Sequence, residues 1–167
     1  MADSDFFIFV TLRQDAHKLH NGKRTNGTYS LRVAGVKSEL VGGNLKTIES
    51  LSGSKSDIDT TGKILFVEDT GEYLYSLDRM FWNLKRSGKL NKLSALLIGG
   101  FKIKKDDVGE EFGKSIEEIV LEKVAAYNYP VCFDFAVGHQ KNNFALKCGV
   151  QHKLSVHLNE CMLIEVK

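Results

Sequence analysis

Three polar side chains follow apolar segments in this sequence, and their types could carry acid–base chemistry. Glu68 and Asp69 come directly after the apolar run of residues 64–67, and His139 follows the apolar segment of residues 131–135. In a catalytic triad, an imidazole takes a proton from a serine or cysteine, while a carboxylate fixes the tautomer of the imidazole and stabilises the imidazolium. A carboxylate and an imidazole brought together would therefore supply two of the three parts.

Asp69 has a structural explanation that Glu68 lacks. Asp69 is followed by Glu72 at the spacing of a capping box, so we expect its carboxylate to cap a helix that begins directly after it. That helix is predicted from an apolar stripe, two basic residues in its last turn and a terminating glycine: Leu74, Leu77, Phe81, Leu84, Lys85, Arg86 and Gly88. Glu68 is therefore the catalytic candidate. The spacing leaves an alternative open, in which Glu68 is a solvated strand end and His139 a loop residue beside a glycine.

The sequence supplies no recognisable nucleophile for this pair. No serine lies in a G-x-S-x-G motif, and Cys132, inside the segment before His139, is expected to pack rather than react. The three cysteines, Cys132, Cys148 and Cys161, are an odd number without a CxxC pair. This pattern fits reduced thiols better than disulfides or a zinc site, and we expect no metal ion.

Alternating strands and helices bring Glu68 and His139 to one edge of a predicted sheet. Residues 64–67 and 95–98 are continuous apolar runs typical of parallel strands covered on both faces, and residues 131–135 form a third strand. A segment of helical periodicity separates each strand from the next, which indicates right-handed crossovers. Ligands gather at the carboxyl ends of such strands, so this edge is the predicted site.

Antiparallel strands toward both ends of the chain complete the predicted fold. The remaining expected elements are strands over residues 6–10, 29–33 and 39–41, the last two on either side of Gly35, a short helix capped by Asn44, a helix over residues 112–127, and a tail hairpin of residues 153–158 and 161–166. Gly42 and Gly43 are interpreted as a tight turn before the short helix rather than as an anion site. We predict an α/β domain in three layers, with helices on one face of a mainly parallel sheet and a smaller antiparallel sheet on the other.

Composition excludes several classes of protein. The 167 residues are 43% hydrophobic and 26% charged, which is ordinary for one globular domain. The 23 basic and 21 acidic residues give a net charge of +2 and are scattered, so we expect no nucleic-acid partner. We also expect no membrane span and no signal peptide. A phosphoacceptor receiver domain would need an aspartate after the strand of residues 95–98, where Gly99 and Gly100 stand instead.

Five segments form an ordered set through most of the chain. They are LVGGNL at 40–45, GKILFVEDTGEYLYSLDRM at 62–80, LKRSGKL at 84–90, LLIGGF at 96–101 and YPVCFDFAVGHQKNNFAL at 129–146. Together they resemble the carboxy-terminal half of the LD-carboxypeptidase family. These are serine peptidases that include murein tetrapeptide carboxypeptidases and microcin C self-immunity peptidases. Lys147 departs from the family pattern, because many relatives have proline there.

The resemblance implies a fold and a set of site residues. The implied fold is the three-layer swivelling β/β/α domain, over residues 29–167, preceded by a poorly matched arm of residues 1–28. The implied site is a Ser-Glu-His triad in which Glu68 and His139 are the second and third members. Its serine belongs to an amino-terminal domain that this chain lacks. Asn44 and Asn143 are expected as substrate-contacting or supporting residues.

The resemblance also implies an activity. The parent enzyme would remove a terminal D-amino acid from tetrapeptides derived from peptidoglycan, in the cytoplasm, as a homodimer and without a metal or cofactor. Its partners would be the muropeptide or peptide substrate and the missing amino-terminal domain, and the isolated chain is expected to be inactive. The alternative is a non-enzymatic module that binds muropeptides or peptides, or that only mediates dimerisation.

Overall fold

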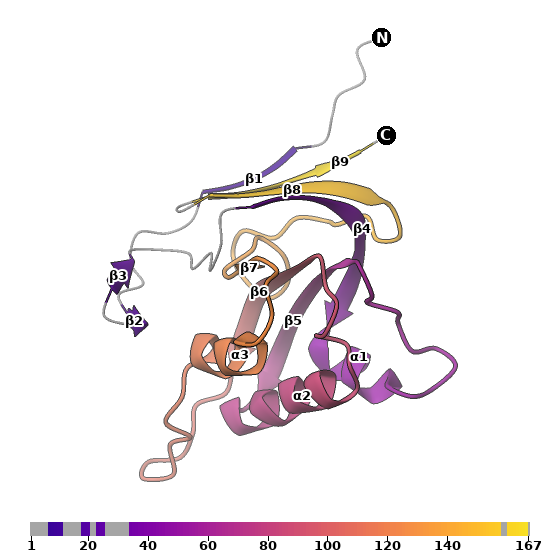
Figure 1. The fold of residues 1–167 in the computed structure, drawn as a ribbon. Helices are drawn as coiled ribbons and strands as arrows, with labels where there is room; N and C mark the ends of the chain where they lie inside the picture. Colours follow the sequence, from indigo (N-terminus) through magenta and orange to yellow (C-terminus); the bar gives the residue numbers. More distant parts are fainter. Residues whose placement is uncertain (1–6, 12–17, 21–22, 26–33, 158–159, 167) are drawn as a thin grey trace.

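One long strand, β4 (Ala34–Asn44), joins two differently built halves of a single sheet (Figure 1). The computed structural model describes residues 7–11, 18–20, 23–25, 34–157 and 160–166, and the side chains of 35–156 and 161–166. The strand order of the sheet is β1-β9-β8-β4-β5-β6-β7. The first part of β4 pairs antiparallel with β8, and its last five residues pair parallel with β5. The α/β class is therefore confirmed.

The parallel half carries all three helices of the described residues. Its strands are β5 (Ile64–Glu72), β6 (Ala95–Ile103) and β7 (Val131–Cys132), and its helices are α1 (Leu45–Leu51), α2 (Leu74–Arg86) and α3 (Ile116–Val124). The helices lie on one face of these strands (Figure 1). The predicted stripe of α2 is confirmed, because Leu77, Phe81 and Leu84 are buried in the same cluster as the β5 residues Leu65 and Val67.

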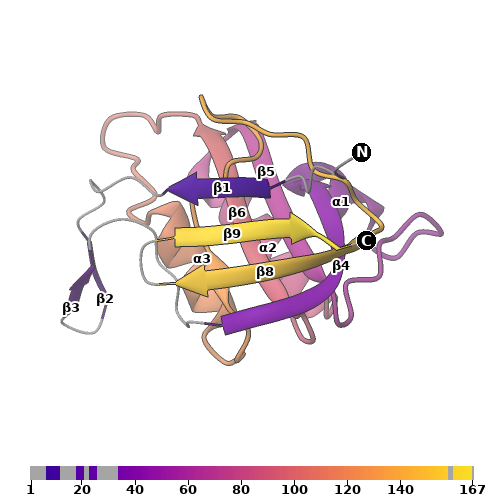
Figure 2. The ribbon, with the colours of Figure 1, turned by 90° about the horizontal axis from the view of Figure 1, so that it is seen from above.

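The antiparallel half covers the opposite face of the parallel strands (Figure 2). It consists of β1 (Phe7–Thr11), β8 (Gln151–His157), β9 (Glu160–Glu165) and the start of β4. Leu154 and Leu163 of this half pack with Ile64, Phe66 and Leu97 in a second buried cluster. The order of layers agrees with the prediction, and so does the tail hairpin. The prediction of a separate antiparallel sheet is wrong, because β4 is hydrogen-bonded into both halves and joins them in one sheet.

The glycines of β4 do not interrupt the strand. Gly35 lies inside the strand, so the break expected there does not occur, and the strand expected at 39–41 is part of a longer one. Gly42 and Gly43 also lie in β4 rather than in a turn. A Cβ at Gly42, whose φ is 148°, would stand 2.0 Å from the carbonyl oxygen of Phe66. The close approach of β5 therefore requires a glycine there. The strand expected at 29–33 lies outside the described residues.

Three element boundaries differ from the expected ones for local reasons. β6 runs through both of its glycines to Ile103 instead of ending at Ile98. β7 stops at Cys132, and Asp134 has a φ of 53°, which a strand cannot contain. α3 is shorter than residues 112–127, since a capping box between Ser115 and Glu118 sets its start.

The amino-terminal segment is described only in its strands. β1 confirms the strand expected over residues 6–10 and pairs with β9 at the edge of the antiparallel half. β2 (Lys18–His20) and β3 (Lys23–Thr25) pair with each other. The domain boundary after residue 28 stays a prediction. Within the described ranges, no helix is long and apolar enough to cross a membrane.

Candidate active site

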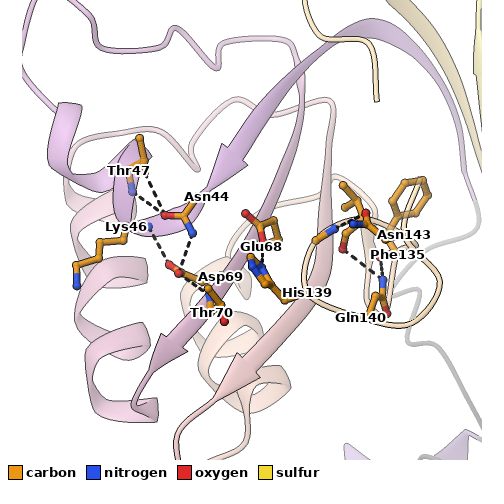
Figure 3. A network of polar contacts seen from close by, with 12 residues as sticks. Asn44, Lys46, Thr47, Glu68, Asp69, Thr70, Phe135, His139, Gln140 and Asn143 are labelled. Carbon is orange, nitrogen blue, oxygen red and sulfur yellow. Dashed lines mark hydrogen bonds and ion pairs between the residues drawn. The ribbon is translucent and has the colours of Figure 1, made fainter. Parts of the chain in front are cut away.

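The alternation of β5 sends its two adjacent carboxylates to different layers. Leu65 and Val67 belong to the cluster beneath the helices, and Phe66 to the cluster beneath the antiparallel half. Successive side chains of a strand point to opposite faces, so Asp69 follows Val67 toward the helices and Glu68 follows Phe66 away from them. One polar pair in the sequence thus becomes two separate groups (Figure 3).

A β-bulge in β6 lies directly opposite Glu68. Val67 pairs with Ile98 and Asp69 pairs with Phe101, so the single residue between them faces Gly99 and Gly100. Bulges bend a strand locally and redirect side chains, and they are frequent beside active sites. This one lies where the chain must make room for Glu68.

Glu68 and His139 form the central contact of the site. Glu68 Oε2 lies 2.6 Å from His139 Nδ1, although the two residues are 71 positions apart in the sequence. The side chain of Glu68 is 13% exposed and that of His139 is 45% exposed. A carboxylate can only accept, so the proton of this contact belongs to Nδ1, and Nε2 of the neutral imidazole keeps a lone pair. The contact holds the tautomer that a general base needs.

Two glycines enclose the side chain of Glu68. A Cβ added at Gly138, whose φ is 88°, would lie 2.4 Å from Glu68 Cβ and 2.9 Å from Oε2. A Cβ at Gly99 would lie 3.3 Å from Glu68 Cβ. A side chain at Gly138 is therefore excluded by Glu68, and one at Gly99 is excluded by Val137, whose carbonyl oxygen would lie 2.6 Å from the added Cβ. The carboxylate of Glu68 is held by packing as well as by its hydrogen bond to His139.

The loop that carries His139 is fastened to β6 and to itself. The His139 N–H donates to the carbonyl oxygen of Gly100 at 3.1 Å. The Gly138 N–H donates to Asn143 Oδ1 at 3.0 Å (Figure 3). Asn143 therefore supports the turn that presents the imidazole, while a contact of Asn143 with substrate stays a prediction.

Asp69 is part of a different group, at the start of α1. Its carboxylate accepts from Asn44 Nδ2 at 2.8 Å and from the Lys46 N–H at 3.0 Å, and its side chain is buried. Asn44 is the predicted N-cap of α1 and accepts from the Thr47 N–H at 3.1 Å. These bonds give Asn44 a structural role (Figure 3), and its role as a substrate contact stays a prediction.

The predicted capping box of α2 was wrong. Its N-cap is Tyr73, which makes no side-chain cap hydrogen bond, and Asp69 lies within β5, paired with β6. Glu72 instead forms an ion pair with Lys46 at 2.6 Å. The hydrogen bond to Glu72 is the main cause that raises the pKa of Lys46 above its usual value. Asp69 and Glu72 have the spacing of a capping box, but both lie in β5, which continues past the expected start of the helix.

Cys132 has the surroundings of a packing residue. It is fully buried, and its pKa is raised well above the usual value, first by a hydrogen bond with the Cys161 thiol and then by burial. A thiol held neutral is a poor nucleophile. In the described part of the chain, no serine, threonine or cysteine side chain is hydrogen-bonded to His139.

The bulge of β6 and the side-chain contacts of Gln140 are not predicted from the sequence. From the sequence, Gly99 and Gly100 are the predicted end of a strand, although glycines inside an apolar strand can signal a bulge. Gln140 Nε2 donates to the carbonyl oxygens of Phe135 and Val137, and no motif marks such a contact.

The fold and the site together define a class of protein. It is an α/β domain that presents a carboxylate-bound imidazole at the carboxyl edge of parallel strands. Residues 37–154 match the family model of the LD-carboxypeptidase C-terminal domain, and the chain belongs to that family.

Known relatives agree with this assignment. The chain is 35% identical over 115 residues to a probable murein peptide carboxypeptidase of Bacillus subtilis. This match covers 69% of this chain and 36% of the relative. It is 33% identical over 124 residues to the murein tetrapeptide carboxypeptidase of Pseudomonas aeruginosa. This match covers 74% of this chain and 38% of the relative. The chain thus spans little more than a third of these relatives.

Solved structures show the same fold. The muramoyltetrapeptide carboxypeptidase of Oxalobacter formigenes superposes with a TM-score of 0.76 at 25% identity, over 100% of this chain and 52% of the solved chain. The microcin C7 self-immunity protein MccF superposes with a TM-score of 0.75 at 22% identity, over 99% of this chain and 52% of that chain. At this identity, the likeness to MccF concerns the fold alone.

Proposed function

We propose that this chain supplies Glu68 and His139 of a Ser-Glu-His triad to an LD-carboxypeptidase. The observation that carries the proposal is the 2.6 Å contact between Glu68 Oε2 and His139 Nδ1. It is supported by the family and by the exposed imidazole, which has no nucleophile bonded to it in the described residues. The serine is assigned to the part of the longer relatives that this chain does not cover.

The proposed substrate is a tetrapeptide from peptidoglycan with a terminal D-amino acid, as the names of the relatives suggest. In the proposed reaction, the serine hydroxyl attacks the carbonyl carbon of the last peptide bond while His139 Nε2 takes its proton. Glu68 stabilises the imidazolium. The imidazolium then protonates the leaving amino group, and water hydrolyses the acyl-enzyme with His139 again as the base. Cytoplasmic location, a homodimeric parent, the swivelling β/β/α architecture and the absence of a cofactor are further parts of the proposal.

A chimera tests the proposal. The matching third of the Pseudomonas aeruginosa enzyme is replaced by this chain, and release of D-alanine from an L,D-tetrapeptide is measured by chromatography. We expect turnover by the chimera, its loss in His139→Ala, and none by this chain alone, because no nucleophile among the described residues is hydrogen-bonded to His139. A folded chimera that binds the tetrapeptide without cleaving it would favour the binding module instead. Turnover by the chain alone, abolished in His139→Ala, would overturn the assignment of the nucleophile.

A further inference from the structure

Gln140 anchors the segment that leads into the His139 turn. Its Nε2 group donates to the carbonyl oxygen of Phe135 and, at 3.3 Å, to that of Val137 (Figure 3). The Val137 oxygen also accepts from the Gly100 N–H at 2.7 Å. One carbonyl oxygen thus receives both the amide of Gln140 and the backbone of β6, so the side chain ties this segment to the bulge opposite Glu68.

The backbone of Gln140 closes the turn itself. Its N–H donates to the carbonyl oxygen of Gly138 at 2.9 Å, which makes His139 the central residue of a three-residue turn. The side chain of Gln140 packs on the bulge as well, because its Cβ and Cγ lie 2.7 Å and 2.8 Å from where a Cβ of Gly100 would stand. Gln140 is half-buried, so this packing is largely shielded from water.

The imidazole has few other restraints. The side chain of His139 is 45% exposed, and among the described residues its side-chain hydrogen-bond partner is Glu68 alone. Its position therefore depends on where the backbone of the turn lies. A displacement of about 1 Å at a reacting group can lower a rate by about 100-fold. In the proposed triad, the anchoring of this backbone would therefore affect the rate.

We propose that Gln140 is a positioning residue. Its side-chain amide holds the His139 turn at a fixed distance from β6 and thereby aligns His139 Nδ1 with Glu68. This inference rests on the proposed function for its effect on turnover. Its structural part, the alignment of His139 with Glu68, concerns this chain alone and can be measured without the rest of the proposed enzyme.

The variants separate hydrogen bonding from packing. Gln140→Met keeps a side chain of similar length on Gly100 and removes both N–H donors, while Gln140→Ala removes both kinds of contact. Gln151→Met is the matched control, because Gln151 is an exposed glutamine at the start of β8. Circular dichroism and the urea midpoint show whether each variant is folded.

The first measurement is nitrogen-15 NMR of His139 in this chain at pH 8.5. We expect a predominant Nδ1–H tautomer in the parent chain and in Gln151→Met. In Gln140→Met and Gln140→Ala, we expect at least tenfold faster exchange of the Nδ1 proton and a mixture of tautomers. Unchanged exchange and tautomer in both Gln140 variants, with folding intact, would overturn the inference.

The second measurement is turnover in the chimera. We expect both Gln140 variants to lower kcat by about 10- to 100-fold with little change in KM, while Gln151→Met is unchanged. If the Gln140 variants keep the NMR signature and turnover while Glu68→Gln loses turnover, only the role of Gln140 fails. If they lose the NMR signature but neither they nor Glu68→Gln loses turnover, the alignment part stands and the proposed triad fails. A loss in Gln140→Ala alone would assign its effect to packing and overturn the role of the amide.

Discussion

Glu68 and Asp69 are neighbours in one strand, yet their surroundings are opposite in kind. Asp69 is buried, and its oxygens accept from Asn44 and from the Lys46 N–H, so its bonding is internal to the fold. Glu68 makes its contact with a half-exposed histidine, one nitrogen of which faces no described partner. A carboxylate that joins two elements is structural, whereas one that orients an accessible base is available for chemistry.

The largest expected effect is the loss of the orienting carboxylate. In the chimera, we expect Glu68→Gln to lower kcat by about two to four orders of magnitude with a much smaller change in KM, since the interaction is realised mainly in the transition state. Steady-state kinetics with an L,D-tetrapeptide measure both constants. If Asp69→Asn reduced turnover more than Glu68→Gln, with both proteins folded, the catalytic carboxylate would be the wrong member of the pair.

The second variant, Gly138→Ala, fills the space beside Glu68 and leaves the side chains of Glu68 and His139 unchanged. Gly138→Ala should lower turnover by at least tenfold, because its Cβ would stand 2.4 Å from Glu68 Cβ. Gly109→Ala separates this clash from backbone strain. Gly109 has a φ of 86°, close to the 88° of Gly138, but no atom lies within 4 Å of its added Cβ. Both variants should lose about 1–2 kcal/mol of stability from the positive φ, and equal turnover in the two would refute the packing argument.

The third prediction concerns the structural member of the pair. Asp69→Asn places a donor where Asn44 Nδ2 and the Lys46 N–H both need an acceptor, so one buried hydrogen bond is lost. We expect a loss of about 1–3 kcal/mol in the free energy of unfolding, measured with urea. Turnover should fall by less than tenfold. An unchanged urea midpoint would show that the Asp69 group does not hold α1 to β5.

The smallest effect is expected from the ion pair at the end of β5. Glu72→Gln removes the contact with Lys46, an exposed side chain, so the urea midpoint should shift only slightly at low salt and not at 1 M salt. Because Glu72 raises the pKa of Lys46 in the folded protein, this contribution is present below pH 10.5 and disappears as the pH rises through the folded-state pKa. Weakening of α2 in this variant, seen by hydrogen exchange, would instead restore Glu72 as a capping residue.

Periodicity and residue type predicted the elements whose signals are local. The apolar run that begins β5, the buried stripe of α2, the cap of α1 by Asn44 and the tail hairpin all depend on residues a few positions apart. The same local signals predicted that Glu68 and His139 reach one edge, because the carboxyl ends of parallel strands meet there. Their short contact agrees with that prediction.

Tertiary structure alone decided the features that depend on distant partners. Asp69 has the spacing of a cap, but pairing with β6 keeps it in the strand, and the cost of leaving sheet hydrogen bonds unmade outweighs a local capping preference. Gly42 and Gly138 need glycine because the backbone of Phe66 and the side chain of Glu68 approach them, from 24 and 70 positions away. The sequence gives the residue type at each position, but which atoms lie beside that residue is decided only when the layers pack.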